Sequence, residues 1–388
     1  MVSLLLPVIY LAFISLGLPD ALLGAAWPSM YPQLGAGVSW AGGVSMIISV
    51  GTIVSSLASD RLNSKLGTGK VTALSVATTA VALFGFSTCT QFWQLCLWAI
   101  PYGLGAGSVD AALNNYVALH YESRHMSWLH CFWGVGTVIS PCVMSWALRH
   151  SGWQLGYRTV ALMQLAIGVV LVLTLPVWNI HRDEAQTARA GQVLGIRGAL
   201  KIKGAPTLFV GFFAYCGAEG TSIRWASRHL ARGAGLFRLS GRRPARRCCM
   251  WASPWARFVS GFIADKVGDR GMIRLGTGVI AAALAVLALP GGGELGALLG
   301  LGLLGLGNAP VYPAIIHATP ANFGEENSQG IIGMQMASAY VGTCLMPPLF
   351  GLIANHIDIA LFPVFLLVVL AAMVFAHERL LHSAKRPA

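Results

Sequence analysis

The stretch Gly261-Phe262-Ile263-Ala264-Asp265-Lys266-Val267-Gly268-Asp269-Arg270 separates two apolar runs of the sequence and places charged residues at their junction. A weaker copy, Ser56-Leu57-Ala58-Ser59-Asp60-Arg61-Leu62-Asn63-Ser64-Lys65, precedes it by 205 residues. The copy lacks both glycines of the later stretch, which weakens the prediction of a tight turn there. An unrelated string repeats at nearly the same offset, because residues 136–141 (GTVISP) recur as residues 342–347 (GTCLMP), 206 positions later. Two motifs at nearly one offset indicate a chain built from two parallel halves.

The composition excludes a set of soluble domains. Of the 388 residues, 55% are hydrophobic and 10% are charged, whereas a soluble domain carries about 25% charged residues. The mean hydropathy is +0.66. Because so few charges cannot cover a surface that faces water, the sequence predicts an all-α membrane protein, in which each crossing helix needs about 20 mostly apolar residues.

Apolar runs along the chain predict twelve transmembrane helices in two pseudo-symmetric halves. The runs lie at about 2–31, 37–59, 71–90, 92–119, 126–148, 157–180, 205–228, 250–264, 272–290, 294–317, 329–350 and 357–377. A polar stretch divides the sixth run from the seventh. We therefore expect a six-helix bundle at 1–180, a cytoplasmic linker at 181–204 and a second six-helix bundle at 205–388, with the eighth helix disturbed.

The net charge of +12 is mainly topological. No soluble segment interleaves basic and aromatic residues, so a nucleic-acid partner is not expected. Most lysines and arginines instead gather in loops that follow even-numbered helices. Basic residues mark cytoplasmic loops, so we expect a multi-pass protein of a bacterial inner membrane with both termini in the cytoplasm.

The stretch 261–270 is similar to the loop signature of the major facilitator superfamily. Within that superfamily, the chain resembles the fucose/galactose proton symporter family. The matching stretches are 103–114 (GLGAGSVDAALN), 129–134 (LHCFWG), 308–313 (NAPVYP) and 335–340 (QMASAY). The likeness covers nearly the whole chain apart from about 228–256. It implies the major facilitator fold, with a solute site between the halves and access that alternates by rocking.

Two acids inside predicted spans are candidate proton carriers. An ionisable group within a membrane is unfavourable and is therefore a functional candidate. Asp20 follows Pro19 in the first helix, and Asp110 shares a helix face with Asn114. The resemblance implies that Asp20 and Asp110 are the proton-coupling carboxylates. The alternative places Asp20 near an interface, where it is solvated.

Further polar and aromatic residues are candidates for solute binding, because sugar hydroxyls need two-way hydrogen-bond partners and an apolar sugar face suits an aromatic ring. They are Asn114, Asn115, His130, Trp133, Tyr215, Glu219, Asn308, Tyr312 and Gln335. Interhelical hydrogen bonding is the alternative for the amides. Glu219 can also pair with a cation across the pseudo-symmetry axis or meet lipid headgroups, and Arg257 is a further charged residue within a span.

The charged residues of the two repeated stretches predict a gate. Asp60 or Asp265, at a helix end, can pair with a neighbouring helix end or a basic group and so hold one conformation. Arg61, Lys266 and Arg270 complete the predicted gating set. Ordinary inner-face charges would account for the basic residues but not for the two acids.

Residues 236–255 do not read as a membrane helix. Five arginines stand between Gly235 and Trp255, and each would oppose central insertion by about 3 kcal/mol. Shifting the reading frame of Cys249 to Trp255 makes that stretch apolar. We hypothesise that the segment is translated out of frame, and a genuine basic outer loop is the alternative.

The sequence therefore predicts a monomeric secondary transporter that takes up a sugar or similar small polar solute with protons across the lipid bilayer. One alternative is a facilitator-type exporter of drugs or metabolites. Another is an inactive, frame-shifted remnant. No P-loop or nucleophile elbow is present, and no enzymatic activity, catalytic residue, cofactor or metal is expected.

Overall fold

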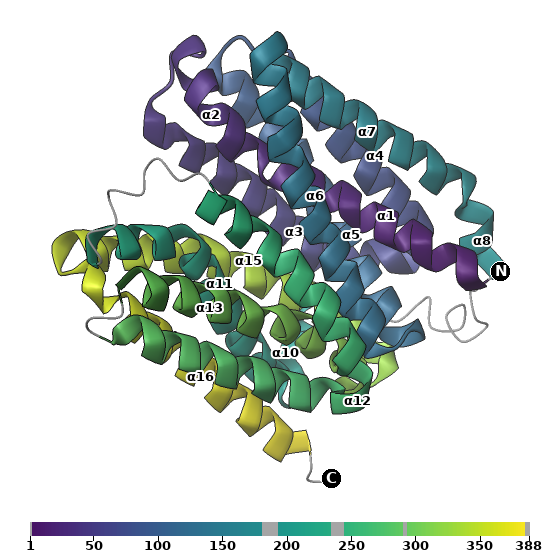
Figure 1. Ribbon diagram of the computed structural model, residues 1–388. Coiled ribbons are helices and arrows are strands. Elements are labelled where there is room, and N and C mark those ends of the chain that lie inside the picture. Colours follow the sequence, from purple (N-terminus) through teal and green to yellow (C-terminus); the bar gives the residue numbers. More distant parts are fainter. Residues whose placement is uncertain (1, 181–192, 234–243, 290–292, 385–388) are drawn as a thin grey trace. The chain divides into compact units, whose positions relative to one another are not determined.

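The computed structural model describes residues 2–180, 193–233, 244–289 and 293–384 (Figure 1). Every regular element in these ranges is a helix. In the N-terminal half the helices are α1 (Val2–Asp20), α2 (Leu22–Gln33), η1 (Val38–Trp40), α3 (Ala41–Leu66), α4 (Thr68–Ser87), α5 (Phe92–His120), α6 (Ser123–His150), α7 (Trp153–Leu173) and α8 (Leu175–Ile180). In the C-terminal half they are α10 (Gly195–Lys201), α11 (Ala205–Gly233), α12 (Pro244–Ala288), α13 (Gly293–His317), α14 (Thr319–Phe323), α15 (Glu325–His356), η3 (Ile359–Leu361) and α16 (Phe362–Ala384).

The first predicted run is divided into α1 and α2 at Ala21. Pro19 has no backbone N–H, so the carbonyl of Ser15 loses its helical partner. The side-chain amide of Gln164 on α7 donates to that carbonyl at 2.7 Å. Both side chains are buried. The break therefore leaves a satisfied backbone and sets Asp20 at the end of α1.

A tight turn lies within the later copy of the repeated stretch and directly after the earlier one. In the later copy, Gly268 has φ 74° and ψ 161° and divides α12 into two helices. In the earlier copy, the turn between α3 and α4 is made by Gly67, with φ 78° and ψ 157°. Glycine adopts this conformation without a steric penalty. The missing glycine at Asn63 is thus replaced by one that stands four residues later.

The chain forms two compact units that do not follow the midpoint of the sequence. The first unit contains Met1–Val117, Leu129–Arg197 and Glu326–Ala337. The second contains Ala118–Trp128, Gly198–Glu325 and Ser338–Ala388. Each unit therefore includes a short segment from the other half of the sequence. The boundaries expected at 180 and 205 stay a prediction.

The repeated GT-xxx-P strings produce equivalent helix crossings in the two units. In the first unit, a Cβ atom at Gly136 of α6 would overlap the carbonyl oxygen of Ile14 on α1. In the second, a Cβ atom at Gly342 of α15 would overlap the carbonyl oxygen of Phe213 on α11. Small residues let membrane helices approach this closely. The sequence repeat is therefore also a repeat of packing.

Nine helices among the described residues are long and apolar enough to cross a membrane. The helices α5 and α11, each of 29 residues, are not among the nine. They carry several of the predicted polar site residues, including Asp110 and Glu219. The count of twelve spans stays a prediction. Most of the anomalous segment 236–255 lies outside the residues whose side chains the structure describes.

Candidate functional site

Asp20 is the best-defined candidate site of the first unit. It lies inside the span Leu5–Gln33 and yet is exposed. The indole Nε1 of Trp133 on α6 donates to its Oδ2 at 2.9 Å. The hydroxyl of Tyr102 on α5 donates to its Oδ1 at 3.3 Å. Three helices therefore build this site, because α5 and α6 each donate one hydrogen bond to the carboxylate of α1.

Asp110 belongs to a chain of buried polar groups in the same unit. The Nδ2 of Asn114 donates to the Asp110 Oδ1 at 2.8 Å and to the Asp110 backbone oxygen at 2.9 Å. The Nε2 of His130 on α6 lies 3.1 Å from the Asn114 Oδ1. All three residues are at most 8% exposed. The spacing of Asp110 and Asn114 was predicted to place them on one face, and the structure connects that face to His130.

Two further candidates for solute binding lie elsewhere in the first unit. The Oδ1 of Asn115 accepts a hydrogen bond of 2.7 Å from the Ser328 hydroxyl on α15. Both of these residues are buried. Gln335, also on α15, is fully buried. The Asn115–Ser328 contact matches the alternative of interhelical hydrogen bonding.

Aromatic candidates gather in the second unit. The Tyr215 hydroxyl donates to the backbone oxygen of Asn308 at 2.8 Å. The ring of Tyr312 lies 4.9 Å from that of Phe212 and 6.3 Å from that of Tyr215, measured between centroids. Tyr215 and Asn308 also line a cavity of about 10 Å³. This space suits a single water molecule and is too small for a sugar.

Glu219 and Arg257 form a buried ion pair in the second unit. The Arg257 Nη2 lies 3.1 Å from the Glu219 Oε1, and the two side chains are 6% and 17% exposed, respectively. Glu219 is thus paired with a cation of its own unit, whereas the prediction was a cation across the pseudo-symmetry axis. A buried charge that keeps a partner avoids most of the desolvation penalty that an isolated charge would incur.

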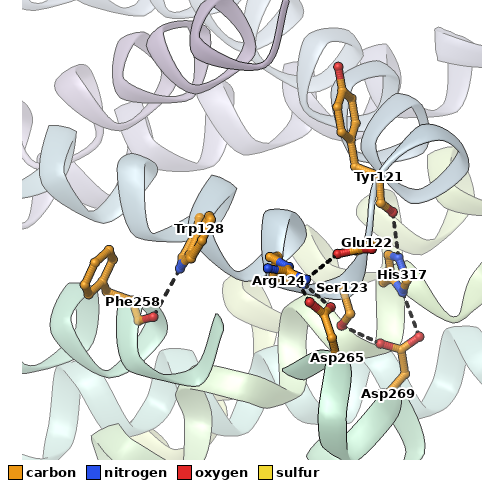
Figure 2. Close-up of polar contacts among 9 residues, drawn as sticks. All are labelled: Tyr121, Glu122, Ser123, Arg124, Trp128, Phe258, Asp265, Asp269 and His317. Atoms are coloured by element: carbon orange, nitrogen blue, oxygen red, sulfur yellow. Dashed lines mark hydrogen bonds and ion pairs between the residues drawn. The ribbon is translucent and has the colours of Figure 1, made fainter. Parts of the chain in front are cut away.

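Asp265, the predicted gating acid of the later copy, contacts the start of α6 (Figure 2). The backbone N–H of Arg124 donates to the Asp265 Oδ1 at 2.9 Å, and the Arg124 guanidinium is paired with Asp265 Oδ2. Helix N-termini have unpaired N–H groups and a partial positive charge, which a carboxylate stabilises. A side chain at position 261 would collide with the indole of Trp128. The motif therefore supplies the carboxylate of Asp265, which binds the start of α6, and the glycine at 261, which leaves room for Trp128 of α6.

The earlier copy has a similar arrangement in the first unit. The Asp60 Oδ2 accepts a hydrogen bond of 3.3 Å from the backbone N–H of Gly195, where α10 begins. A Cβ atom at Gly333 of α15 would lie 2.7 Å from the Ser56 carbonyl oxygen. In this contact the glycine, Gly333, belongs to α15, whereas in the later copy the glycine, Gly261, belongs to the motif itself. The remaining gating candidates, Arg61, Lys266 and Arg270, are exposed.

A comparison with known families identifies the fold. The family model of the Major Facilitator Superfamily matches residues 9–237 and 248–387. The chain belongs to the major facilitator superfamily. The resemblance to this superfamily is therefore confirmed, and the protein is a multi-pass membrane transporter. The match leaves out residues 238–247, within the anomalous segment.

Solved structures support the same fold. This facilitator has a TM-score of 0.76 and 15% identity with FucP in its outward conformation, over 96% of this chain and 98% of that one. It has a TM-score of 0.72 and 18% identity with an E. coli fucose:proton symporter variant, over 96% and 98% of the two chains. The proton:xylose symporter XylE also gives 0.72, at 14% identity, over 96% and 94%. At these identities the likeness establishes the fold.

A curated relative matches a smaller part of the facilitator. The yeast (Saccharomyces cerevisiae) protein called Bypass of stop codon protein 6 is 23% identical over 163 residues. These residues make up 41% of this chain and 33% of the yeast protein. The match thus spans about a third of the relative.

Sequence reasoning missed several residues that the structure brings to these sites. Tyr102 and Gln164 occur in apolar helices, where a single polar side chain carries little signal. Arg124 reads as an ordinary basic residue before a span. His317, at the end of α13, contacts Asp269 of the repeated motif. Among the residues with a described placement, no three His, Cys, Asp or Glu side chains lie close enough to hold a metal ion.

Proposed function

We propose that this facilitator takes up a sugar or a similar small polar solute together with protons, by alternating access. The observation that carries the proposal is the exposed Asp20 carboxylate inside a long apolar span, held by Trp133 and Tyr102. A charged carboxylate is strongly disfavoured in lipid. The exposure of Asp20 is therefore compatible with a water-filled space beside this side chain, through which protons can reach the carboxylate.

The buried chain from Asp110 to His130 supports a second proton-responsive group. Because the Asn114 Nδ2 donates to Asp110, the Asn114 Oδ1 faces His130 and must accept. The His130 Nε2 then carries the hydrogen. The Asn114 Nδ2 also donates to the Asp110 backbone oxygen, which fixes the orientation of the amide. A proton on the other carboxyl oxygen of Asp110 would leave these contacts in place and remove only the charge.

The solute class follows from the residues that remain partly open. Asn114, Asn115 and His130 are buried and engaged with other side chains. Trp133 in the first unit is part-buried, as are Asn308 and Tyr312 in the second. An indole offers an apolar face to a sugar ring. Trp133 would then connect solute binding to the acid that its Nε1 contacts.

The names of the structural neighbours support the same solute class. FucP is a fucose:proton symporter and XylE a proton:xylose symporter. We propose the same coupling here, in a monomer of a bacterial inner membrane with cytoplasmic termini. An inactive remnant is the second candidate, because the family match omits residues 238–247 of the anomalous segment.

The experiment is solute uptake into proteoliposomes with simultaneous recording of internal pH, using L-fucose, D-xylose and D-glucose as probes. A membrane potential of 100 mV supplies about 2.3 kcal/mol per proton, or about 50-fold accumulation. We expect uptake to acidify the interior. In Asp20→Asn and Asp110→Asn, accumulation should fall to about unity while solute exchange remains. The exposed carboxylate Glu326 provides the matched control as Glu326→Gln.

The same vesicles separate the alternatives. Unchanged proton movement in both Asn variants would overturn the proton-coupling roles. A remnant would be inactive as written and would gain uptake when residues 236–255 are encoded in the alternative frame. An exporter of amphipathic compounds would instead extrude a fluorescent drug and leave the sugars untouched.

A further inference from the structure

His317 occupies an unusual position in the second unit, because both of its ring nitrogens face acceptor oxygens (Figure 2). Its Nδ1 lies 2.7 Å from the Asp269 Oδ2. Its Nε2 lies 3.1 Å from the backbone oxygen of Tyr121, between α5 and α6. The other carboxylate oxygen of Asp269 accepts a hydrogen bond of 2.7 Å from the Ser123 hydroxyl. We call Tyr121, Ser123, Asp269 and His317 the histidine clamp.

Counting hydrogens determines the charge that this arrangement requires. A neutral imidazole has one N–H and one lone pair, and a backbone carbonyl oxygen can only accept. With a neutral ring and an ionised Asp269, one of the two contacts would place a lone pair against an oxygen. An imidazolium satisfies both contacts. A proton shifted from Nδ1 to Asp269 would satisfy them as well, so the clamp holds one extra proton in either form.

Burial disfavours a charge on His317, but the carboxylates and the carbonyl oxygen around the ring together outweigh that effect. Tyr121 directly follows the C-terminus of α5, the negative end of the helix dipole, which stabilises a cation. From α12, the carboxylates of Asp269 and Asp265 both act on His317. The α5–α6 turn adds Glu122 and Arg124, which pair with each other at 2.7 Å.

The neighbouring histidine is His125, whose ring lies 5.7 Å from that of Tyr121 between centroids. The Tyr121 phenol is excluded by its chemistry. Burial raises the pKa of the Tyr121 phenol, and a phenol in a solvated peptide already has a pKa of about 10. A histidine changes charge near neutral pH. The His317 and Asp269 side chains are 19% and 18% exposed, so water can deliver and remove the proton.

We propose that His317 is a proton-binding site separate from Asp20 and Asp110, and that its proton fastens the α5–α6 turn onto α12 and α13. The clamp joins Tyr121 and Ser123, from the first half of the sequence, to two helices of the second half. The Arg124–Asp265 pair lies in the same contact. Because the fastened state holds the extra proton, it is strongest at low pH and loosens as pH rises through the titration of His317.

The regulatory consequence rests on the proposed function. In the expected topology the α5–α6 turn faces the cytoplasm. Proton-coupled uptake acidifies that side, and acidification would keep the clamp fastened. Uptake would therefore slow as cytoplasmic pH falls, which limits the acid load that the transporter itself creates.

The test is hydrogen–deuterium exchange of residues 118–128 in the purified full chain in lipid nanodiscs, between pH 5.5 and 8, corrected for intrinsic exchange rates. One linked proton changes an opening equilibrium by at most about tenfold per pH unit. We expect wild-type protection to fall with that slope near neutral pH. His317→Gln should be less protected at pH 5.5 and show no such step. His317→Arg should stay protected throughout, since its charge is permanent.

Two further variants keep the result interpretable. His356→Gln removes an exposed histidine at the end of α15 and should behave as wild type. Asp269→Asn removes the carboxylate and should abolish the step even if the Gln variant fails to fold. A wild-type segment without a pH step, or a step that persists in both His317→Gln and Asp269→Asn, would refute the clamp. The measurement needs no solute, so inactive transport would leave it unaffected.

Discussion

The two compact units share a scaffold but hold their acids differently. Each has a close helix crossing made by the glycine of the repeated GT string. In the first unit, Asp20 accepts from the neutral groups of Trp133 and Tyr102. In the second, Glu219 is paired with Arg257, and Asp265 with Arg124. Identical packing therefore supports carboxylates in two electrostatic settings.

This difference indicates which acids can change charge during transport. A buried carboxylate that loses its charge beside a cation leaves that cation unpaired, which is strongly unfavourable. A carboxylate held by neutral donors loses only part of two hydrogen bonds when it is protonated. Under the proposed function, we therefore assign proton carrying to the carboxylates of the first unit. The second is suited to holding structure, with the histidine clamp as its proton-dependent contact.

The largest effect is expected when the buried pair of the second unit is broken. Arg257→Gln leaves Glu219 without its cation and should destabilise the protein by about 3–5 kcal/mol. The double variant Glu219→Gln/Arg257→Gln should recover most of the loss. Thermal unfolding in detergent measures both. In the exposed pair Arg274–Glu378, Arg274→Gln provides the control and should change stability by less than about 1 kcal/mol. Equal losses for the two pairs would contradict the comparison.

A smaller effect should show that the scaffolds are equivalent. Gly136→Ala and Gly342→Ala each place a Cβ atom against a backbone carbonyl that cannot move aside. Forced repacking of this kind costs about 1–3 kcal/mol, and we expect similar losses for both variants in the same unfolding assay. At Gly302, no heavy atom lies within 4 Å of the place that a Cβ atom would occupy, so Gly302→Ala should be neutral or slightly stabilising. A loss in only one unit would mean that the crossings differ.

The smallest effect concerns the neutral donors of the first unit. Trp133→Phe keeps the ring but removes the hydrogen bond to Asp20. A hydrogen bond to a charged group contributes about 1.5–3 kcal/mol, so the protonated form should persist to higher pH. We expect the midpoint of the pH profile of solute-driven proton uptake to rise by about one unit. Trp93→Phe, at the exposed start of α5, should leave the midpoint in place. The same midpoint in both variants would remove Trp133 from the coupling site.

Much of the fold could be predicted from the sequence, because helices in a membrane must satisfy their own backbone groups and bury apolar faces. The long apolar runs and the matching strings therefore predicted a helical membrane protein with two related halves, and the resemblance of residues 261–270 to a known loop signature indicated the superfamily. Predictions of the local backbone, such as turns and helix breaks, were less reliable. The earlier motif has Asn63 where the later one has a glycine, which weakened the prediction of a turn there. The structure forms that turn at Gly67 instead. The first run forms the single candidate span Leu5–Gln33, and only the structure shows that its helix is interrupted at Ala21.

The candidate site was only partly predictable, since residue type marks an acid as unusual without naming its partner. Spacing placed Asp110 and Asn114 on one face, and the structure shows that contact. Asn115 is next to Asn114 in sequence but contacts Ser328, 213 positions away. Neighbouring residues of a helix point in different directions, so each meets a different helix.

By itself, the sequence determined that this chain is a helical membrane protein with two related halves and a few acids inside its spans, because composition and periodicity act locally. Only the tertiary structure decided that Asp20 meets Trp133, that Glu219 meets Arg257, and that His317 reaches Asp269 and Tyr121. These contacts depend on how each helix is rotated and crossed against its neighbours. Packing of the whole unit sets those angles, and no short stretch of sequence contains them.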